Sequence, residues 1–384
     1  MSFWSPQRYQ FEGEKHGIDD DAIAASVEVI KRIQNINARL PVVLTLRHLS
    51  WLTDTNYGYL RKVVSRESGN YKRVLLKKKV PGRSRYREIH IPEASLLAVQ
   101  KWITAKILSN TNAHPSSFAY HPDSQPIFAA SRHCRCKWLL KIDIENFFHS
   151  ISEHMVYKVF RNLGYTKLLS FELARITTTT GLSNKSSEDI LRSDSSRWPS
   201  IPNYYCSNEG FLPQGAPSSP MLSNLVMKAI DKDLEYLANC NGFTYTRYAD
   251  DLAFSTEKNA TIADITRFKK KVNRLLIEAG FNPNRRKTAI RGPGTRRIIL
   301  GILVDSKNPR LSKEYKDQIR QHLYYLCSQE HGPSKHAEAR KLSVSTLFHH
   351  VRGKIAWAEK VEPEFGALCL EKFESISWPP LDKW

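Results

Sequence analysis

The chain has 384 residues, 41% of them hydrophobic, which is enough to bury a large core across two or three packed subdomains. Its 58 Lys and Arg residues against 38 Asp and Glu give a formal charge of +20, which predicts salt-sensitive attraction to polyanions. No apolar run reaches the ~20 residues of a membrane span, and the amino-terminal segment lacks the apolar core of a signal peptide. These features argue against a membrane protein and predict a cytoplasmic location.

The amino-terminal part of the chain predicts helices that precede a basic hairpin. Isoleucine and valine recur at helical spacing in residues 19–37, and residues 46–64 are patterned as short helices. Residues 71–92 alternate basic and apolar side chains around Pro81-Gly82, which predicts two strands and a turn. An amphipathic helix is expected over residues 95–108.

The rest of the chain predicts a sheet followed by helices. Residues 138–144 form an expected strand, with Lys141 and Asp143 on the face opposite its apolar side chains. Residues 177–210 are rich in Ser, Thr and Asn, which predicts a long surface insertion. The further expected elements are a helix ending near Asn239, a hairpin over 243–257, a helix over 269–279, a strand over 297–304, and helices from Leu311 and over 335–359.

Three aspartates stand in two strand contexts. Asp143 lies near the end of an apolar strand, and Asp250 and Asp251 lie at the expected tip of a hairpin. Carboxylate oxygens are the ligands that Mg²⁺ prefers, and two such ions can activate an attacking hydroxyl and stabilise a leaving pyrophosphate. An isolated Asp-Asp pair is common in turns. With a strand aspartate upstream, the pattern favours catalytic phosphoryl transfer with two Mg²⁺ ions.

Several motifs now resemble those of the reverse transcriptases, and especially those of bacterial retrons. In chain order they are LLKIDIENFFHSI around Asp143, LPQGAPSSPMLSNL over residues 212–225, Tyr248-Ala249-Asp250-Asp251, GFNPNRRKTAI over residues 280–290, and RGKIAWAE over residues 352–359. The resemblance implies an α+β right-hand polymerase fold with fingers, palm and a helical thumb. It places a helical extension at 1–44, fingers at 45–137, the palm at 138–305 with the insertion 177–210, and the thumb at 306–384.

The resemblance also implies roles for individual residues. Phe148 corresponds to the aromatic gate that excludes a ribose 2′-hydroxyl, although core packing of the Phe147-Phe148 pair is the alternative. Gln214 corresponds to a residue that contacts the incoming deoxynucleotide, and Arg87 to one that binds its triphosphate. Lys78 or Lys79 could assist, unless that charge run is simply solvated. The basic thumb side chains expected to contact RNA or DNA are Arg352, Lys354, Lys316 and Arg320.

The implied function is that of a retron RNA-directed DNA polymerase. Its partners would be a dedicated noncoding RNA, the RNA-linked single-stranded DNA (msDNA) made from it, and an effector protein encoded nearby for antiphage defence. The alternatives are a group II-like or other bacterial reverse transcriptase and a noncatalytic RNA-binding scaffold. The chain ends soon after the thumb-like helices, which favours a retron enzyme over a maturase.

Two motifs depart from the retron pattern. Residues 129–133 read Ala-Ala-Ser-Arg-His where retron enzymes often carry Asn-Ala-x-x-His, and Ile299-Leu300-Gly301 replaces Val-Thr-Gly. These departures concern the subtype and RNA recognition, whereas the catalytic aspartates are intact.

Other signals carry less weight. His133, Cys134 and Cys136 lack the second ligand pair that a structural zinc site needs. Aromatic residues of the thumb could stack on bases, but their helical spacing favours packing in the core. They are Tyr324, Tyr325 and Trp357.

Overall fold

The computed structural model describes residues 6–67, 70–78, 85–122, 124–181 and 209–380. The chain forms two compact units and crosses between them several times. Unit 1 contains residues 1–115, 144–232 and 278–282, and unit 2 contains residues 116–143, 233–277 and 283–384. The predicted α+β class is confirmed, while the predicted subdomain boundaries stay predictions.

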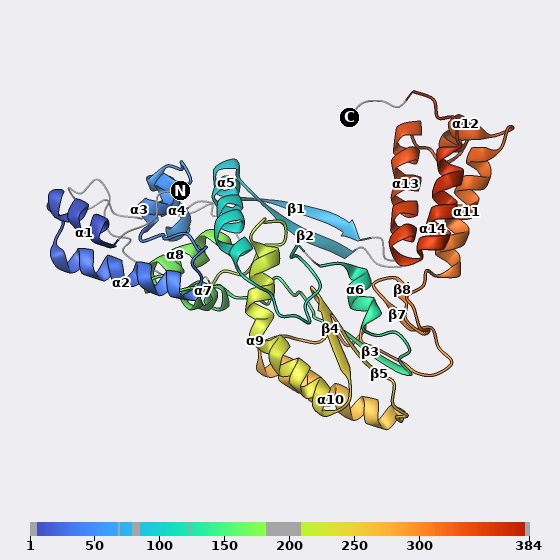
Figure 1. Cartoon of the computed structure of the whole chain (residues 1–384), viewed down its shortest axis with the longest axis horizontal. Helices are drawn as coiled ribbons and strands as arrows, with labels where there is room; N and C mark the ends of the chain where they lie inside the picture. Colours follow the sequence, from blue (N-terminus) through green and yellow to red (C-terminus); the bar gives the residue numbers. More distant parts are fainter. Residues whose placement is uncertain (1–5, 68–69, 79–84, 123, 182–208, 381–384) are drawn as a thin grey trace. The chain divides into compact units, whose positions relative to one another are not determined.

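Unit 1 begins with helices at the blue end of the chain in Figure 1. The predicted helix over residues 19–37 is present as α2, whose isoleucines and valine at helical spacing are buried. Asp19 caps it by accepting a hydrogen bond from the Ala22 amide. The segment 46–64 forms two short helices, as predicted. The helices are α1 (Pro6–Lys15), α2 (Asp20–Ile36), α3 (Leu46–Leu52) and α4 (Tyr57–Ser65).

The predicted basic hairpin is also present in unit 1. Strands β1 (Tyr71–Lys78) and β2 (Arg85–Pro92) pair antiparallel, with Leu76 opposite Arg87. The helix expected over 95–108 is α-helical only at its start and then widens into a π-helical turn before it tightens. The helices are α5 (Ala94–Trp102), η1 (Ile103–Ile107), η2 (Leu108–Asn110), α7 (Glu153–Asn162) and α8 (Lys167–Thr177).

A buried ion network in unit 1 anchors the segment that leads to Gln214. The carboxylate of Glu153 accepts hydrogen bonds from Arg66 and Arg175, each at 2.7 Å. Thr179 and Phe211 exchange backbone hydrogen bonds beside it. The predicted insertion therefore has to be shortened, because Thr177 ends α8 and Thr179 is paired; its centre, 182–208, lies outside the described residues.

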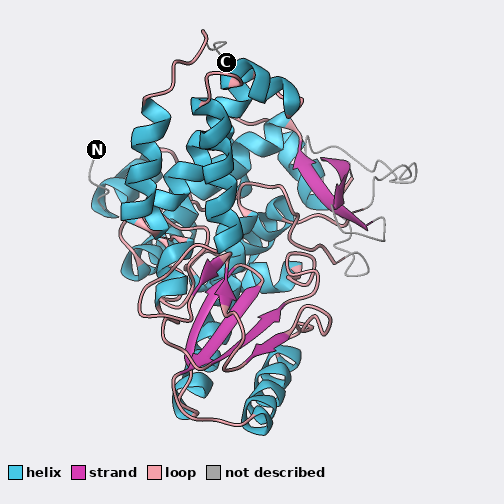
Figure 2. Cartoon of the chain, turned by 90° about the vertical axis from the view of Figure 1, so that its right-hand side faces the viewer, coloured by secondary structure: helices cyan, strands magenta, loops and turns pink. Residues whose placement is uncertain are grey.

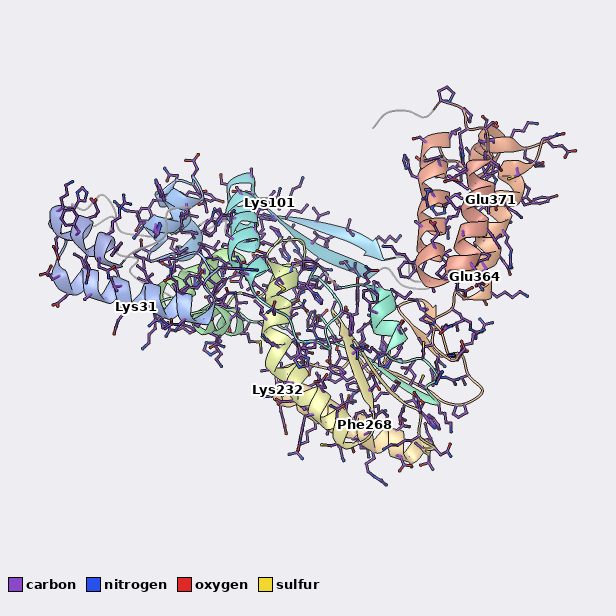
Figure 3. All side chains as sticks on the ribbon, in the orientation of Figure 1. Lys31, Lys101, Lys232, Phe268, Glu364 and Glu371 are labelled. Carbon is purple, nitrogen blue, oxygen red and sulfur yellow. The ribbon has the colours of Figure 1, made fainter. Side chains whose placement is uncertain are left out.

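Unit 2 is built on a four-stranded antiparallel sheet, drawn in magenta in Figure 2, with strand order β4-β5-β3-β6. On one face of this sheet, Phe254 of β5 packs on Phe268 of α10, which is labelled in Figure 3. Helix α10 begins earlier than the predicted range 269–279. The elements are α6 (Pro126–Ser131), β3 (Trp138–Asp143), β4 (Thr244–Tyr248), β5 (Asp251–Thr256), α10 (Ile262–Glu278) and β6 (Ala289–Arg291), and α9 (Ser219–Cys240) runs from unit 1 into unit 2.

The single strand predicted over residues 297–304 is wrong. Two very short strands, β7 (Ile298–Ile299) and β8 (Ile302–Leu303), pair as a tight hairpin instead. Leu300 and Gly301 form its turn with φ of 49° and 82°. Two successive positive φ values match the twist of a two-residue hairpin, and glycine adopts one of them without steric cost.

The thumb-like end of the chain is a helical group, orange to red in Figure 1. The helix predicted over 335–359 is wrong as one element, because Lys341 has a positive φ of 56° and Ser343 caps a new helix. Tyr324 is 72% exposed, which contradicts its expected core position, whereas Trp357 packs against the apolar cluster of these helices. The helices are α11 (Lys313–Cys327), α12 (Gly332–Ala339), α13 (Val344–Val361) and α14 (Pro363–Glu374).

Within the described ranges, no helix combines the length and apolar character needed to cross a membrane.

Candidate active site

The β4–β5 hairpin presents Asp250 and Asp251 through a two-residue turn. Tyr248 pairs with Asp251, so Ala249 and Asp250 alone make the turn. Ala249 has a φ of 56°, a left-handed conformation that glycine adopts easily and alanine rarely. Such conformations persist where surrounding structure enforces them, and they concentrate at functional sites.

Asp143 lies directly opposite Asp251 across the β3–β5 pair. Residues opposite each other in an antiparallel pair project to the same face with their Cβ atoms close together, and like charges there repel. Asp143 is only 7% exposed. The sheet therefore gathers the three predicted aspartates at one end, two on facing strands and one in the adjoining turn.

Two side chains from the segment after α10 hold the carboxylate of Asp143. Lys287 Nζ donates to Oδ1 at 2.6 Å, and Asn284 Nδ2 donates to Oδ2 at 3.1 Å. The backbone N–H of Asn284 also donates to the backbone carbonyl of Asp143 at 2.7 Å. This bond holds the segment after α10 against the end of β3. The orientation of Asp143 is thus fixed by residues more than a hundred positions away.

The site carries more negative than positive charge. Burial raises the pKa of Asp250, and the nearby charges of Asp251 and Asp143 raise it further, while Lys287 opposes the change. Burial also raises the pKa of Asp251, and so does Asp143, whereas Lys141 and Lys287 lower it. Both directions mean that ionising these carboxylates costs more here than in water, and a cation beside them would offset part of that cost.

The donor set fits a hard divalent cation in chemistry and charge. All three predicted ligands are carboxylates, and magnesium prefers oxygen ligands. Among the described residues, no three or more His, Cys, Asp or Glu side chains already form a metal cage. The ammonium of Lys287 forms an ion pair with Asp143.

In unit 1, the segments that carry the predicted nucleotide-binding residues meet around His90. The His90 amide donates to the Gln214 carbonyl at 2.8 Å, which joins strand β2 to the Gln214-Gly215 turn. Gly215 has a φ of 116°, and a Cβ there would come within 2.7 Å of Ile89. His149, next to Phe148, stacks on Phe211 with ring centroids 4.6 Å apart.

The positions of the predicted nucleotide contacts differ in character. Phe147 is the core member of the phenylalanine pair at 4% exposed, while Phe148 is only half-buried beside it. Arg87 is exposed on β2, and Gln214 is half-buried. Lys78 ends β1 opposite Arg85, and Lys79 lies outside the described residues. These placements suit the predicted roles, which stay predictions.

The four predicted thumb contacts all have partners within the thumb. Lys316 pairs with Glu362, and Arg352 pairs with Glu359 at 3.1 Å. Arg320 pairs with Asp317 at 3.0 Å, and Lys354 donates to Gln318 at 2.8 Å. Only Arg320 of these four is exposed, and an exposed ion pair such as Arg320–Asp317 contributes little stability. RNA binding by these residues therefore stays a prediction.

The sequence alone did not identify the residues that support the aspartates. Asn284 and Lys287 lie within the GFNPNRRKTAI segment, and their spacing around a turn gives no sign that both reach Asp143. Arg247 was also missed. Its side chain is fully buried, although it stands only two residues before the turn residue Ala249.

Comparison with known proteins identifies the family of the chain. Residues 76–304 match the family model described as reverse transcriptase (RNA-dependent DNA polymerase). The chain is 27% identical over 350 residues to the retron Ec86 reverse transcriptase of Escherichia coli, covering 90% of this chain and 98% of that enzyme. It is 30% identical over 286 residues to the retron Mx65 reverse transcriptase of Myxococcus xanthus, covering 74% of this chain and 61% of that one.

Among solved structures, a foamy viral protease–reverse transcriptase in complex with double-stranded DNA matches with a TM-score of 0.41 and 16% identity. That match covers 81% of this chain and 42% of the viral one. The family assignment rests on the family model, which spans the aspartates and the sheet that carries them. The chain belongs to the reverse transcriptase family and is an RNA-directed DNA polymerase that resembles those of bacterial retrons.

Proposed function

We propose that this enzyme extends a primer on an RNA template by magnesium-dependent nucleotidyl transfer at Asp143, Asp250 and Asp251. The observation that carries the proposal is the placement of Asp143 opposite Asp251 at the end of the sheet. Two bound Mg²⁺ ions would activate the primer hydroxyl and neutralise the phosphates. The three carboxylates would hold these ions and so help to position the reacting strand end.

The residues of unit 1 would select the nucleotide. Arg87 offers a guanidinium fork that matches triphosphate oxygens. Gln214 would contact the incoming nucleotide, and the ring of Phe148 would exclude a 2′-hydroxyl by its bulk. The half-buried position of Phe148, next to the core residue Phe147, supports this role.

The resemblance to retron enzymes carries the finer proposal. The template would be a dedicated structured noncoding RNA, and the product an RNA-linked single-stranded DNA primed from an internal guanosine 2′-hydroxyl. The biological role would be antiphage defence with an effector protein encoded nearby. Sequencing the nucleic acid that copurifies with the protein tests this directly: one RNA joined to complementary DNA supports it, and a mixture of cellular RNAs contradicts it.

The catalytic proposal is tested by primer extension with Asp250→Asn. We expect synthesis to fall about a thousandfold or more, because several kcal/mol of charge stabilisation are lost with a metal ligand. Folding should be retained, since burial raises the pKa of Asp250 and a neutral Asn side chain avoids the cost of burying its charge. Asp264→Asn, an exposed aspartate on α10, is the matched control and should extend normally. Normal extension by folded Asp250→Asn would overturn the assignment.

A further inference from the structure

Three aromatic rings meet in unit 1, and we call His90, His149 and Phe211 the ring cluster. His149 stacks on Phe211 with ring centroids 4.6 Å apart and ring planes 29° from parallel. The ring of His90 meets Phe211 edge to face at 5.6 Å and lies 6.0 Å from His149. The cluster joins strand β2, the segment that follows β3 and the segment that precedes α9, all within unit 1. These are the segments that carry the predicted nucleotide contacts.

Two backbone hydrogen bonds attach the Gln214 segment to its neighbours at the cluster. The His90 amide donates to the Gln214 carbonyl at 2.8 Å, and the Leu212 amide donates to the Ile151 carbonyl at 3.0 Å. The first bond holds the segment on strand β2. The second holds it on the segment that contains His149. The position of Gln214 therefore depends on how closely these segments pack where the rings meet.

His149 also links the cluster to Phe148, its neighbour in the chain. Phe147 is fixed in the core on one side of Phe148, at 4% exposed, and His149 is stacked on Phe211 on the other. Phe148 itself is half-buried between them. Because both neighbours of Phe148 are held, the direction of its ring is set by the core and by the cluster together. Loss of the stack would release one of these two supports.

The two imidazoles of the cluster are held in their neutral form by burial. His90 is 2% exposed and His149 is half-buried, and burial lowers the pKa of both. Glu88 on β2 raises both pKa values, and its carboxylate lies 3.2 Å from His90 Nε2, but it also pairs with Arg73 of β1. Arg73 and His149 lower the pKa of His90, and the ring of Tyr71 faces His90 edge on. Acid would therefore add charge to a packed group of rings.

We propose that the ring cluster positions the incoming deoxynucleotide, because the stack of His149 on Phe211 fixes Phe148 and Gln214 relative to each other. This inference rests on the polymerase function proposed above. The rings act through the backbone of their neighbours and are positioning residues, while Phe148 and Gln214 make the contacts. The stack therefore contributes to nucleotide binding and selectivity, and the chemical step at the aspartates does not require it.

The test measures KM for deoxynucleotide and kcat in single-nucleotide extension of an RNA-template/DNA-primer duplex. His149→Ala removes the stacked ring, so KM should rise roughly three- to tenfold, the factor that the loss of one aromatic pair corresponds to, while kcat changes little. Its preference for deoxynucleotides over ribonucleotides should fall by a similar factor. His149→Phe retains a ring that stacks, and it should restore KM and selectivity at neutral pH.

A pH profile separates positioning by the imidazole from simple bulk. Between about pH 7.5 and pH 5.5, on either side of the ordinary histidine pKa, KM of the parent protein should rise as the cluster gains protons. His149→Phe removes one of the titrating rings, so its KM should rise less over the same range. Any effect of acid on the nucleotide or the duplex is common to both proteins and cancels in their ratio.

His154→Ala, which removes an exposed histidine on α7, is the matched control and should behave like the parent protein. A parental KM in folded His149→Ala would overturn the proposal. So would equal acid profiles for the parent and His149→Phe, a comparison that remains available if His149→Ala does not fold. A lower kcat at constant KM would show that the ring supports only the fold. If the parent protein extends no primer, the proposed function fails instead, which keeps the two failures distinct.

Discussion

The guanidinium of Arg247 donates from Nη1 to the carbonyl oxygen of Ala249 at 3.2 Å, in the turn that also carries Asp250. Arg247 is fully buried, and its backbone is bound on both sides, with its amide donating to Ser116 and its carbonyl accepting from Phe118. It pairs with Leu252, so its side chain projects from the face opposite Asp251. A buried arginine thus donates a hydrogen bond to Ala249, the residue with the strained positive φ.

Arg247→Lys should therefore impair catalysis more than folding. A lysine keeps the charge but cannot reproduce the planar fork of the guanidinium. We expect kcat to fall about tenfold and the Mg²⁺ concentration for half-maximal rate to rise, because a charge-assisted hydrogen bond of ~1.5–3 kcal/mol is removed from the turn. Adding Ala249→Gly should restore part of the rate, since glycine adopts the positive φ unaided. No rescue by the second change would show that Arg247 acts only through general stability.

The turn itself can be tested with a pair of substitutions at Ala249. Ala249→Val should destabilise the protein by about 1–3 kcal/mol, because a β-branched side chain is poorly tolerated at a φ of 56°. Ala249→Gly should fold at least as well as the parent. Thermal unfolding of the two variants measures the difference, and equal melting temperatures would contradict the strain.

Phe148→Ala should admit ribonucleotides. The ring is half-buried next to Phe147, and its removal opens space where a 2′-hydroxyl would otherwise clash. Single-nucleotide incorporation measures the preference for deoxynucleotides over ribonucleotides. This preference should drop by about tenfold or more, which corresponds to a loss of ~1.4 kcal/mol of discrimination. Phe148→Tyr, which retains the bulk, is the control and should keep the selectivity. If the Phe148→Ala protein is active and its selectivity is unchanged, Phe148 is not a steric gate and only packs against Phe147.

Stability should fall in acid through His133. This imidazole is completely buried and hydrogen-bonded to Ser255 Oγ and Thr246 Oγ1, each at 2.7 Å, and burial lowers its pKa to about 3. Below its unfolded pKa of about 6.5 the unfolded chain binds a proton that the folded chain does not. The free energy of unfolding should therefore decrease by about 3 kcal/mol between pH 6.5 and pH 4 from this group.

Chemical denaturation of His133→Gln across the same pH range isolates this contribution. The variant should lose less stability between pH 6.5 and pH 4 than the parent protein, whatever its stability at neutral pH. His322, whose pKa burial lowers to about 4, acts in the same direction and remains in both proteins. Parallel curves for the two proteins would exclude His133 as the acid-sensitive group.

The thumb should prefer one structured RNA over other polyanions. Phosphate contacts alone give affinity that falls steeply with salt and carries no sequence preference. Groove shape, 2′-hydroxyls and unpaired bases of a cognate RNA offer more, and exposed Tyr324 is available for stacking. Competition at physiological salt between an RNA encoded near the gene and an unrelated hairpin of equal length should favour the former. Equal competition at every salt concentration would point to a general basic cleft.

The sequence by itself determined most of the local elements and pointed to three aspartates as the predicted catalytic carboxylates. Isoleucine spacing predicted α2, alternation predicted the β4–β5 hairpin, and the order of motifs around Asp143, Asp250 and Asp251 indicated a reverse transcriptase. Such signals are readable because they arise from side-chain periodicity and turn chemistry within a few residues. The turn at Leu300-Gly301 was missed, and one strand was predicted over residues 297–304. The two strands that it joins have only two residues each, which is too few to show a periodic pattern.

Only the tertiary structure decided which distant residues complete the site. Lys287 and Asn284 reach Asp143 across more than a hundred positions, and Ala253 and Ala289 flank Lys141 only because three strands pair in one register. Arginine is a polar residue, yet Arg247 is fully buried, because its position on β4 places its side chain on the same face of the sheet as that of Leu252. Contacts of this kind depend on strand pairing and long-range packing, which leave no periodic trace in the segments that make them.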